Sequence, residues 1–199
     1  MQNKDSHSPL EFIDLVKGHR HIVMFHEDEA YAMKLRLRFL QNGILNGDSC
    51  IYVTPDAPAR VETKMGEQGV DVKKAKDSGL LKVIQSSSDL SNTESVTKRE
   101  DLLDEMLGDG KARRIVFDES PSMDEAGIHG VLEFERYVHT SMTTDHGSNN
   151  PDGKLLFCSY SVKALKPALH AAWMSDLLKL HDSVVFAPEN SDGIGFTMR

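Results

Sequence analysis

The stretch from His21 to Pro58 constrains the fold most, because two apolar runs flank an amphipathic segment there. The first run, Ile22 to Phe25, has the length and composition of a buried strand. Apolar residues then recur at spacings of four, three and four, as on the packed face of a helix: Met33, Leu37, Leu40 and Ile44. The second run, Cys50 to Val53, ends before a proline. The stretch therefore predicts a strand, a helix and a parallel strand, joined by a right-handed crossover.

The same alternation continues along the chain. Further strands are predicted at 80–84, 113–118 and 154–160, and the runs at 184–186 and 194–198 could pair as a C-terminal hairpin. Helices are predicted at 9–16, 57–69, 71–76, 95–107, 124–140 and, in two pieces, 161–180. This order is typical of an α/β chain with a three-layer fold and a largely parallel central sheet. No repeat or linker divides residues 1–199, which we expect to form a single domain with residues 1–8 disordered.

Composition excludes several classes of partner. The 31 acidic and 23 basic residues give a net charge of -8, which repels nucleic-acid phosphates, so we expect no direct binding of nucleic acid. No apolar run approaches the roughly 20 residues that span a bilayer, and the polar N-terminus does not resemble a signal peptide. The two cysteines, Cys50 and Cys158, lie in apolar runs and are expected to be buried and reduced. We therefore expect a cytoplasmic protein that makes no contact with a membrane.

Polar residues follow several of the predicted strands. Because ligands of such sheets bind beyond the carboxyl ends of the strands, these residues are expected to converge on a ligand-binding site. Aromatic rings would supply apolar contact there, and carboxylates would fix the orientation of the ligand. The candidate site comprises His26, Glu27, Asp28, Thr54, Asp118, Glu119, Ser159 and Tyr160.

One of these segments, IVFDES, resembles a Walker B element, in which carboxylates such as Asp118 and Glu119 hold Mg²⁺. The alternative is an ordinary solvated strand end. A P-loop needs glycines and a lysine, but the loop after the first strand, FHEDEA, has neither and carries three carboxylates. Such a loop would repel a triphosphate. We therefore expect no ordinary P-loop hydrolysis of ATP, no cofactor and no catalytic residue.

Histidines and acids raise the question of a metal site. In a strand, His19 and His21 share one face, whereas His26 has the other parity and follows the strand end, so joint ligation of a transition metal is disfavoured. On the helix expected at 124–140, His129 with Glu133 and Glu135 with His139 are each four residues apart and share a face. Metal or proton-transfer chemistry is one interpretation of these pairs. A solvated helix face is the favoured one.

The chain resembles the MEDS domain, a methanogen and methylotroph sensory domain related to RecA-like ATPases of the KaiC type. The resemblance rests on the order of HIVMFHEDE, NGILNGDSCIYVTPDAP and GVDVKKAKDSGLLKVIQ, and it covers about residues 18 to 187. The family's histidine near the first strand matches His21, and its C-x-Y segment matches Cys158-Ser159-Tyr160. Its C-terminal histidine matches His181. Residues Gly43 to Thr54 match a further segment of the family, except that this chain has Ile44 where the family has Leu and Asp48 where it has Glu.

The resemblance implies a RecA-like core without a P-loop, used as a non-catalytic sensory module in signal transduction. Such a module would bind a small molecule, or a signalling protein such as a histidine kinase or a transcription regulator, at the carboxyl edge of the sheet. One alternative is a divergent nucleotide-binding protein or ATPase that uses Asp118 and Glu119 with Mg²⁺. Another is a pure interaction subunit, since RecA-like domains can assemble side by side as homo-oligomers.

Overall fold

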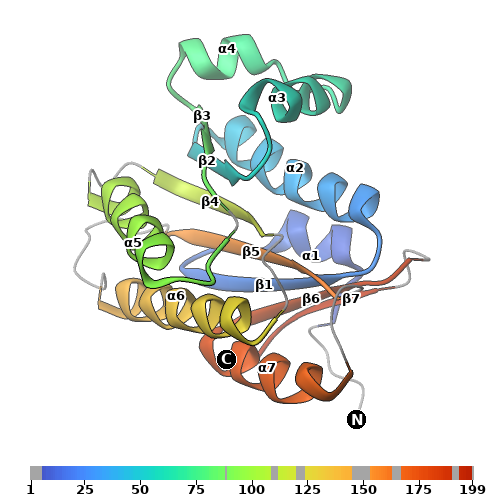
Figure 1. The fold of residues 1–199 in the computed structure, drawn as a ribbon. Coiled ribbons are helices and arrows are strands. Elements are labelled where there is room, and N and C mark those ends of the chain that lie inside the picture. Colours follow the sequence, from blue (N-terminus) through green and yellow to red (C-terminus); the bar gives the residue numbers. More distant parts are fainter. Residues whose placement is uncertain are drawn as a thin grey trace.

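A seven-stranded sheet forms the centre of the molecule (Figure 1). The strands lie in the order β3-β2-β4-β5-β1-β6-β7, and all neighbouring pairs are parallel except the antiparallel pair of β6 and β7. Their bounds are β1 Arg20–His26, β2 Ser49–Thr54, β3 Leu81–Gln85, β4 Ala112–Glu119, β5 Leu155–Ser161, β6 Ser183–Ala187 and β7 Ile194–Thr197. The computed structural model describes residues 6–87, 89–108, 112–119, 124–144, 153–162, 167–189 and 193–198.

Helices connect the strands and cover both faces of the sheet, which confirms the predicted three-layer architecture (Figure 1). Their bounds are α1 Pro9–Leu15, α2 Glu29–Asn46, α3 Pro58–Glu67, α4 Val72–Asp77, α5 Thr93–Gly108, α6 Glu125–Thr144 and α7 Pro167–Leu180. Local capping explains two of the starting points. Ser8 and Glu11 form a capping box at α1, and the carboxylate of Asp28 accepts hydrogen bonds from the first amides of α2.

Side chains alternate between the two faces of the sheet along each strand, so each face has its own half of the hydrophobic core. Ile22 and Met24 of β1 pack with α1, α2, α3 and α4, whereas Val23 and Phe25 pack with α5, α6 and α7. Most strands are buried on both faces, as expected for a parallel sheet covered by helices on each side. Consequently, neighbouring residues of one strand can serve two separate clusters of polar side chains.

Some local expectations are corrected by the structure. His26 is the last residue of β1 and does not lie beyond it. Strands β1 and β2 are parallel, as predicted, but β5 and β4 lie between them. Glu135 is completely buried, whereas the nearby pair of His129 and Glu133 is the exposed ion pair expected for a solvated face. Helix α6 places Glu135 inward because that side of the helix packs against the sheet.

The remaining expectations concern the chain ends, the cysteines and the membrane. Of residues 1–8, positions 1–5 lie outside the described residues, while His7 exchanges backbone hydrogen bonds with Gly195. Cys50 and Cys158 are both buried, as predicted, and face opposite sides of the sheet. Within the described ranges, no helix is both long enough and apolar enough to cross a membrane.

Candidate functional site

The carboxyl ends of β1, β4 and β5 carry a buried polar cluster on the face covered by α2. The cluster is centred on Arg36, a fully buried arginine of α2 that sequence reasoning did not select. Its Nη1 donates a hydrogen bond of 2.7 Å to Ser159 Oγ and lies 3.3 Å from Asp118 Oδ1. Its Nη2 pairs with the carboxylate of Glu29. The four groups come from three elements, α2, β4 and β5, so the cluster links α2 to the end of the sheet.

Tyr52 of β2 completes this cluster. Its hydroxyl donates a hydrogen bond of 2.9 Å to Asp118 Oδ2 and accepts one of 3.1 Å from Arg36 Nε. Burial lowers the pKa of the Arg36 guanidinium, but the neighbouring Tyr52, Asp118 and Glu29 outweigh that effect and raise it above its ordinary value. The arginine is therefore permanently charged, and it neutralises the carboxylate that would otherwise be available to Mg²⁺.

His26 lies at the edge of the same cluster. Its Nε2 is 3.7 Å from Glu29 Oε2, and its buried Nδ1 has no hydrogen-bond partner among the described residues. Burial, reinforced by the charge of Arg36, lowers the pKa of His26 to about 4. His26 is therefore a neutral imidazole at physiological pH.

The other expected site residues serve separate purposes. The Asp28 carboxylate accepts a hydrogen bond of 2.8 Å from the amide of Ala30, at the helix terminus where a P-loop would bind phosphate. Thr54 Oγ1 accepts from the amide of Asp56 and so stabilises the turn after β2. Tyr160 faces the opposite side of the sheet, where its hydroxyl donates to the carboxylate of Glu135. The side chain of Glu119 lies outside what the structure describes.

Glu27 is the expected site residue that lines a cavity at this edge. The cavity has a volume of about 450 Å³ and lies at the carboxyl ends of β1, β5 and β6, next to α7 and β7. Its lining residues are predominantly apolar: Phe25, Glu27, Val162, Met174, Phe186, Ala187, Pro188, Gly193 and Ile194. The rings of Phe25 and Phe186 are stacked at 5.6 Å between centroids. Sequence reasoning missed Phe25, Met174 and Phe186 because apolar residues in strands and helices are usually core residues.

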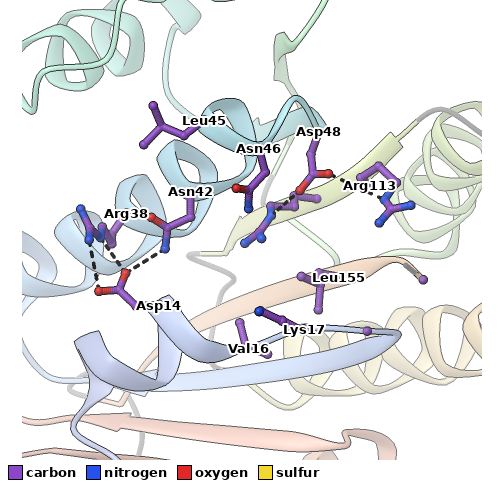
Figure 2. Close-up of a pocket in the computed structure, with 13 residues that line it drawn as sticks. Asp14, Val16, Lys17, Arg38, Asn42, Leu45, Asn46, Asp48, Arg113 and Leu155 are labelled. Atoms are coloured by element: carbon purple, nitrogen blue, oxygen red, sulfur yellow. Dashed lines mark hydrogen bonds and ion pairs between the residues drawn. The ribbon is translucent and has the colours of Figure 1, made fainter. Parts of the chain in front are cut away.

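A larger cavity, of about 770 Å³, opens at the opposite edge of the sheet, where β1, β2, β4 and β5 begin (Figure 2). Its polar side chains are largely engaged with one another. Asp14 accepts hydrogen bonds from Arg38 Nε at 2.7 Å and from Asn42 Nδ2 at 2.8 Å (Figure 2). Asp48 accepts from Arg114 Nε at 3.0 Å. This cavity is therefore a wide polar depression with internally paired charges, and few of its polar groups are left to orient a ligand.

Comparisons with known proteins agree with the predicted fold and resemblance. Residues 20–182 match the sequence profile of the MEDS family, whose description is MEthanogen/methylotroph, DcmR Sensory domain. Among solved structures, the chain is similar to a KaiC-like protein from the hyperthermophilic archaeon Pyrococcus horikoshii OT3, with a TM-score of 0.59 and 13% sequence identity. The match covers 84% of this chain and 70% of that chain, and at such low identity the likeness concerns the fold alone. No match was found among curated proteins.

Proposed function

Because the chain belongs to the MEDS sensory-domain family, we propose that it is a non-catalytic sensory domain that binds a small organic ligand at the carboxyl edge of its sheet. Binding would be reported to a signalling protein, such as a histidine kinase or a transcription regulator. The observation that carries the proposal is the apolar cavity of about 450 Å³ at the ends of β1, β5 and β6. Its size falls within the roughly 300–1,000 Å³ of typical small-molecule sites, and its position is the one expected for ligands of open α/β sheets.

The chemistry of the cavity supports a ligand with an apolar body. Phe25, Phe186 and Met174 supply aromatic and thioether surface, and Glu27 is the one ionisable side chain among the described residues of the lining. Glu27 Oε2 accepts a hydrogen bond of 3.3 Å from the amide of Glu189, which holds the carboxylate near the cavity. Aromatic faces beside a carboxylate favour an apolar molecule that carries an amine or another hydrogen-bond donor.

The nucleotide-binding alternative has less support. Arg36 is bound to Asp118, the carboxylate that would hold Mg²⁺, and Asp28 occupies amides at the start of α2 that would bind phosphate. A nucleotide would have to displace both interactions. The third possibility, an interaction subunit, is compatible with the exposed Leu15 and Leu45, but isolated exposed leucines are common on protein surfaces.

Trp173 provides a natural reporter for the proposed site. It is the single tryptophan of the sequence, and its ring contacts Phe25 edge-on at a centroid distance of 6.0 Å. Small neutral organics, small amines and nucleotides should be screened by thermal shift and by Trp173 emission. A ligand at a hundred times its Kd is expected to stabilise the protein by about 2.7 kcal/mol.

Two variants locate the binding site of any ligand so found. Val162→Phe should fill the cavity and abolish both signals, whereas Leu45→Phe, at the opposite edge of the sheet, should leave them unchanged. Glu27→Gln should weaken the binding of amines more than that of neutral compounds, because it removes a carboxylate charge from the lining. Binding that survives Val162→Phe and is lost in Leu45→Phe would place the ligand in the other cavity.

A further inference from the structure

Four side chains far apart in the sequence converge inside the protein, on the face of the sheet opposite Arg36. They are His21 of β1, Glu135 of α6, Cys158 of β5 and His181, which lies between α7 and β6. Each is at most 1% exposed. Each offers one atom suited to a metal ion, and these four atoms all lie within 4.8 Å of one another.

Three of the six separations between these atoms are close to the edges of a coordination tetrahedron. Glu135 Oε2 lies 3.1 Å from His21 Nε2 and 3.4 Å from His181 Nε2, and Cys158 Sγ lies 3.7 Å from His21 Nε2. A tetrahedral Zn²⁺ with bonds of about 2.0–2.3 Å would separate its ligand atoms by roughly 3.3–3.8 Å. An ion could therefore be accommodated with small adjustments of the side chains.

The backbone fixes which nitrogen of each imidazole faces this centre. His21 Nδ1 lies 3.0 Å from the carbonyl oxygen of Leu180, and His181 Nδ1 lies 2.7 Å from that of Leu177. A carbonyl oxygen can only accept, so both Nδ1 atoms must carry the proton and donate it. In the neutral rings, both Nε2 atoms then present lone pairs inward. Donation of the outer ring nitrogen to a carbonyl is also the usual support of a metal-binding histidine.

The centre thus brings together atoms with lone pairs, and there are too few protons for each of these atoms to accept a hydrogen bond. Glu135 Oε1 accepts a hydrogen bond from Tyr160, but Glu135 Oε2 and His181 Nε2 have no hydrogen-bond partner of adequate geometry among the described residues. A buried carboxylate facing two lone pairs is costly unless a cation lies between them.

We propose that His21, Glu135, Cys158 and His181 form a buried binding site for a tetrahedral transition-metal ion of the Zn²⁺ class. One thiolate and one carboxylate would offset the two positive charges of the ion, and two neutral imidazoles would complete the coordination. Because four protein ligands leave no open position, the site is of the closed, structural type. It would fasten α6 and the α7–β6 junction to β1 and β5. The inference does not depend on the proposed ligand cavity.

The competing explanation is a proton shared between the histidines and Glu135 without any metal. Titration of metal-free, full-length protein with Co²⁺ separates the two, because tetrahedral Co²⁺ absorbs visible light and a cobalt–thiolate bond adds a charge-transfer band. We expect one Co²⁺ per chain with both features, displacement of the cobalt by Zn²⁺, and a higher Tm of the zinc-bound protein.

Two variants and one control assign the ligands. Cys158→Ser is close to isosteric and should abolish the charge-transfer band, and His181→Gln should weaken cobalt binding by at least about tenfold. Cys50→Ser is the matched control, since Cys50 is equally buried but faces the other side of the sheet. It should retain the band.

The Co²⁺ titration of the wild type distinguishes a metal site from a shared proton even if a variant fails to fold. Absence of stoichiometric Co²⁺ binding to the folded, metal-free wild type would overturn the proposal in favour of a shared proton. A band that persists in Cys158→Ser and disappears in Cys50→Ser would overturn it as well, by placing the metal elsewhere.

Discussion

Arg36 Nη1 lies 3.3 Å from Asp118 Oδ1, and this ion pair joins the middle of α2 to the end of β4 inside the protein. In a RecA-like sheet, the carboxylate at this strand end would be the natural ligand of Mg²⁺. Here it is neutralised by a side chain of the same molecule. The ion pair therefore occupies the strand-end carboxylate in a chain that belongs to a sensory-domain family and whose fold is similar to that of a KaiC-like protein.

Mg²⁺-ATP is expected to bind weakly or not at all. Glu27 and Asp28 lie between β1 and α2, Glu29 is the first residue of α2, and Asp118 is already paired. Isothermal titration calorimetry checks this directly. A micromolar affinity that is lost in Asp118→Asn would contradict the prediction and favour a divergent nucleotide-binding protein.

Removing Arg36 is expected to destabilise the protein strongly. Arg36→Met leaves Asp118 buried without its cation, and breaking a buried ion pair typically costs about 3–5 kcal/mol. Arg38→Met is the matched control on the same helix, because Arg38 and Asp14 form a half-exposed pair whose loss should cost about 1 kcal/mol or less. Urea denaturation measures both changes. Equal losses in the two variants would mean that the buried pair contributes no more than the exposed one.

His26 should make stability depend on pH. Its pKa is lowered to about 4 in the folded protein, so between about pH 6.5 and 4 the unfolded chain takes up a proton that the folded protein does not. Its contribution is fully present above pH 6.5 and falls as the pH drops toward 4. From pH 7 to pH 5, the wild type should lose about 1–2 kcal/mol more than His26→Gln.

Denaturation of the wild type and His26→Gln at both pH values tests this difference. Replacing His129, an exposed histidine of α6, by Gln controls for the removal of one imidazole. A wild-type protein and a His26→Gln variant with parallel pH profiles would exclude the predicted role of His26.

Two helical glycines are expected to respond oppositely to alanine. A Cβ at Gly130 would lie 1.7 Å from the carbonyl oxygen of Leu90, so Gly130→Ala must push α6 away from a backbone segment and should destabilise by about 1–3 kcal/mol. A Cβ at Gly66 in α3 meets no atom within 4 Å, so Gly66→Ala should stabilise by about 0.5–1 kcal/mol. Thermal unfolding of both variants provides the measurement. Stabilisation by Gly130→Ala would show that α6 does not approach Leu90 so closely.

Hydrophobic period and capping residues allowed most of the elements to be predicted from the sequence. Ser8, Glu11 and Pro9 define the start of α1 by local contacts, and the run from Ile22 to Phe25 defines a buried strand. These signals are local, because a cap or an alternating pattern involves residues within a few positions of one another. The same reasoning predicted the C-terminal hairpin of β6 and β7.

Only the tertiary structure decided which polar residues are buried and which partners they contact. Arg36 and Glu135 each occur in helices rich in exposed charges, and nothing within a few residues distinguishes a buried ionised side chain from a solvated one. Their partners, Asp118 and His181, are distant in sequence and are brought near by the order of the strands and the packing of α6. Burial of a charge becomes tolerable only when such a partner is in place, and that condition depends on the whole fold.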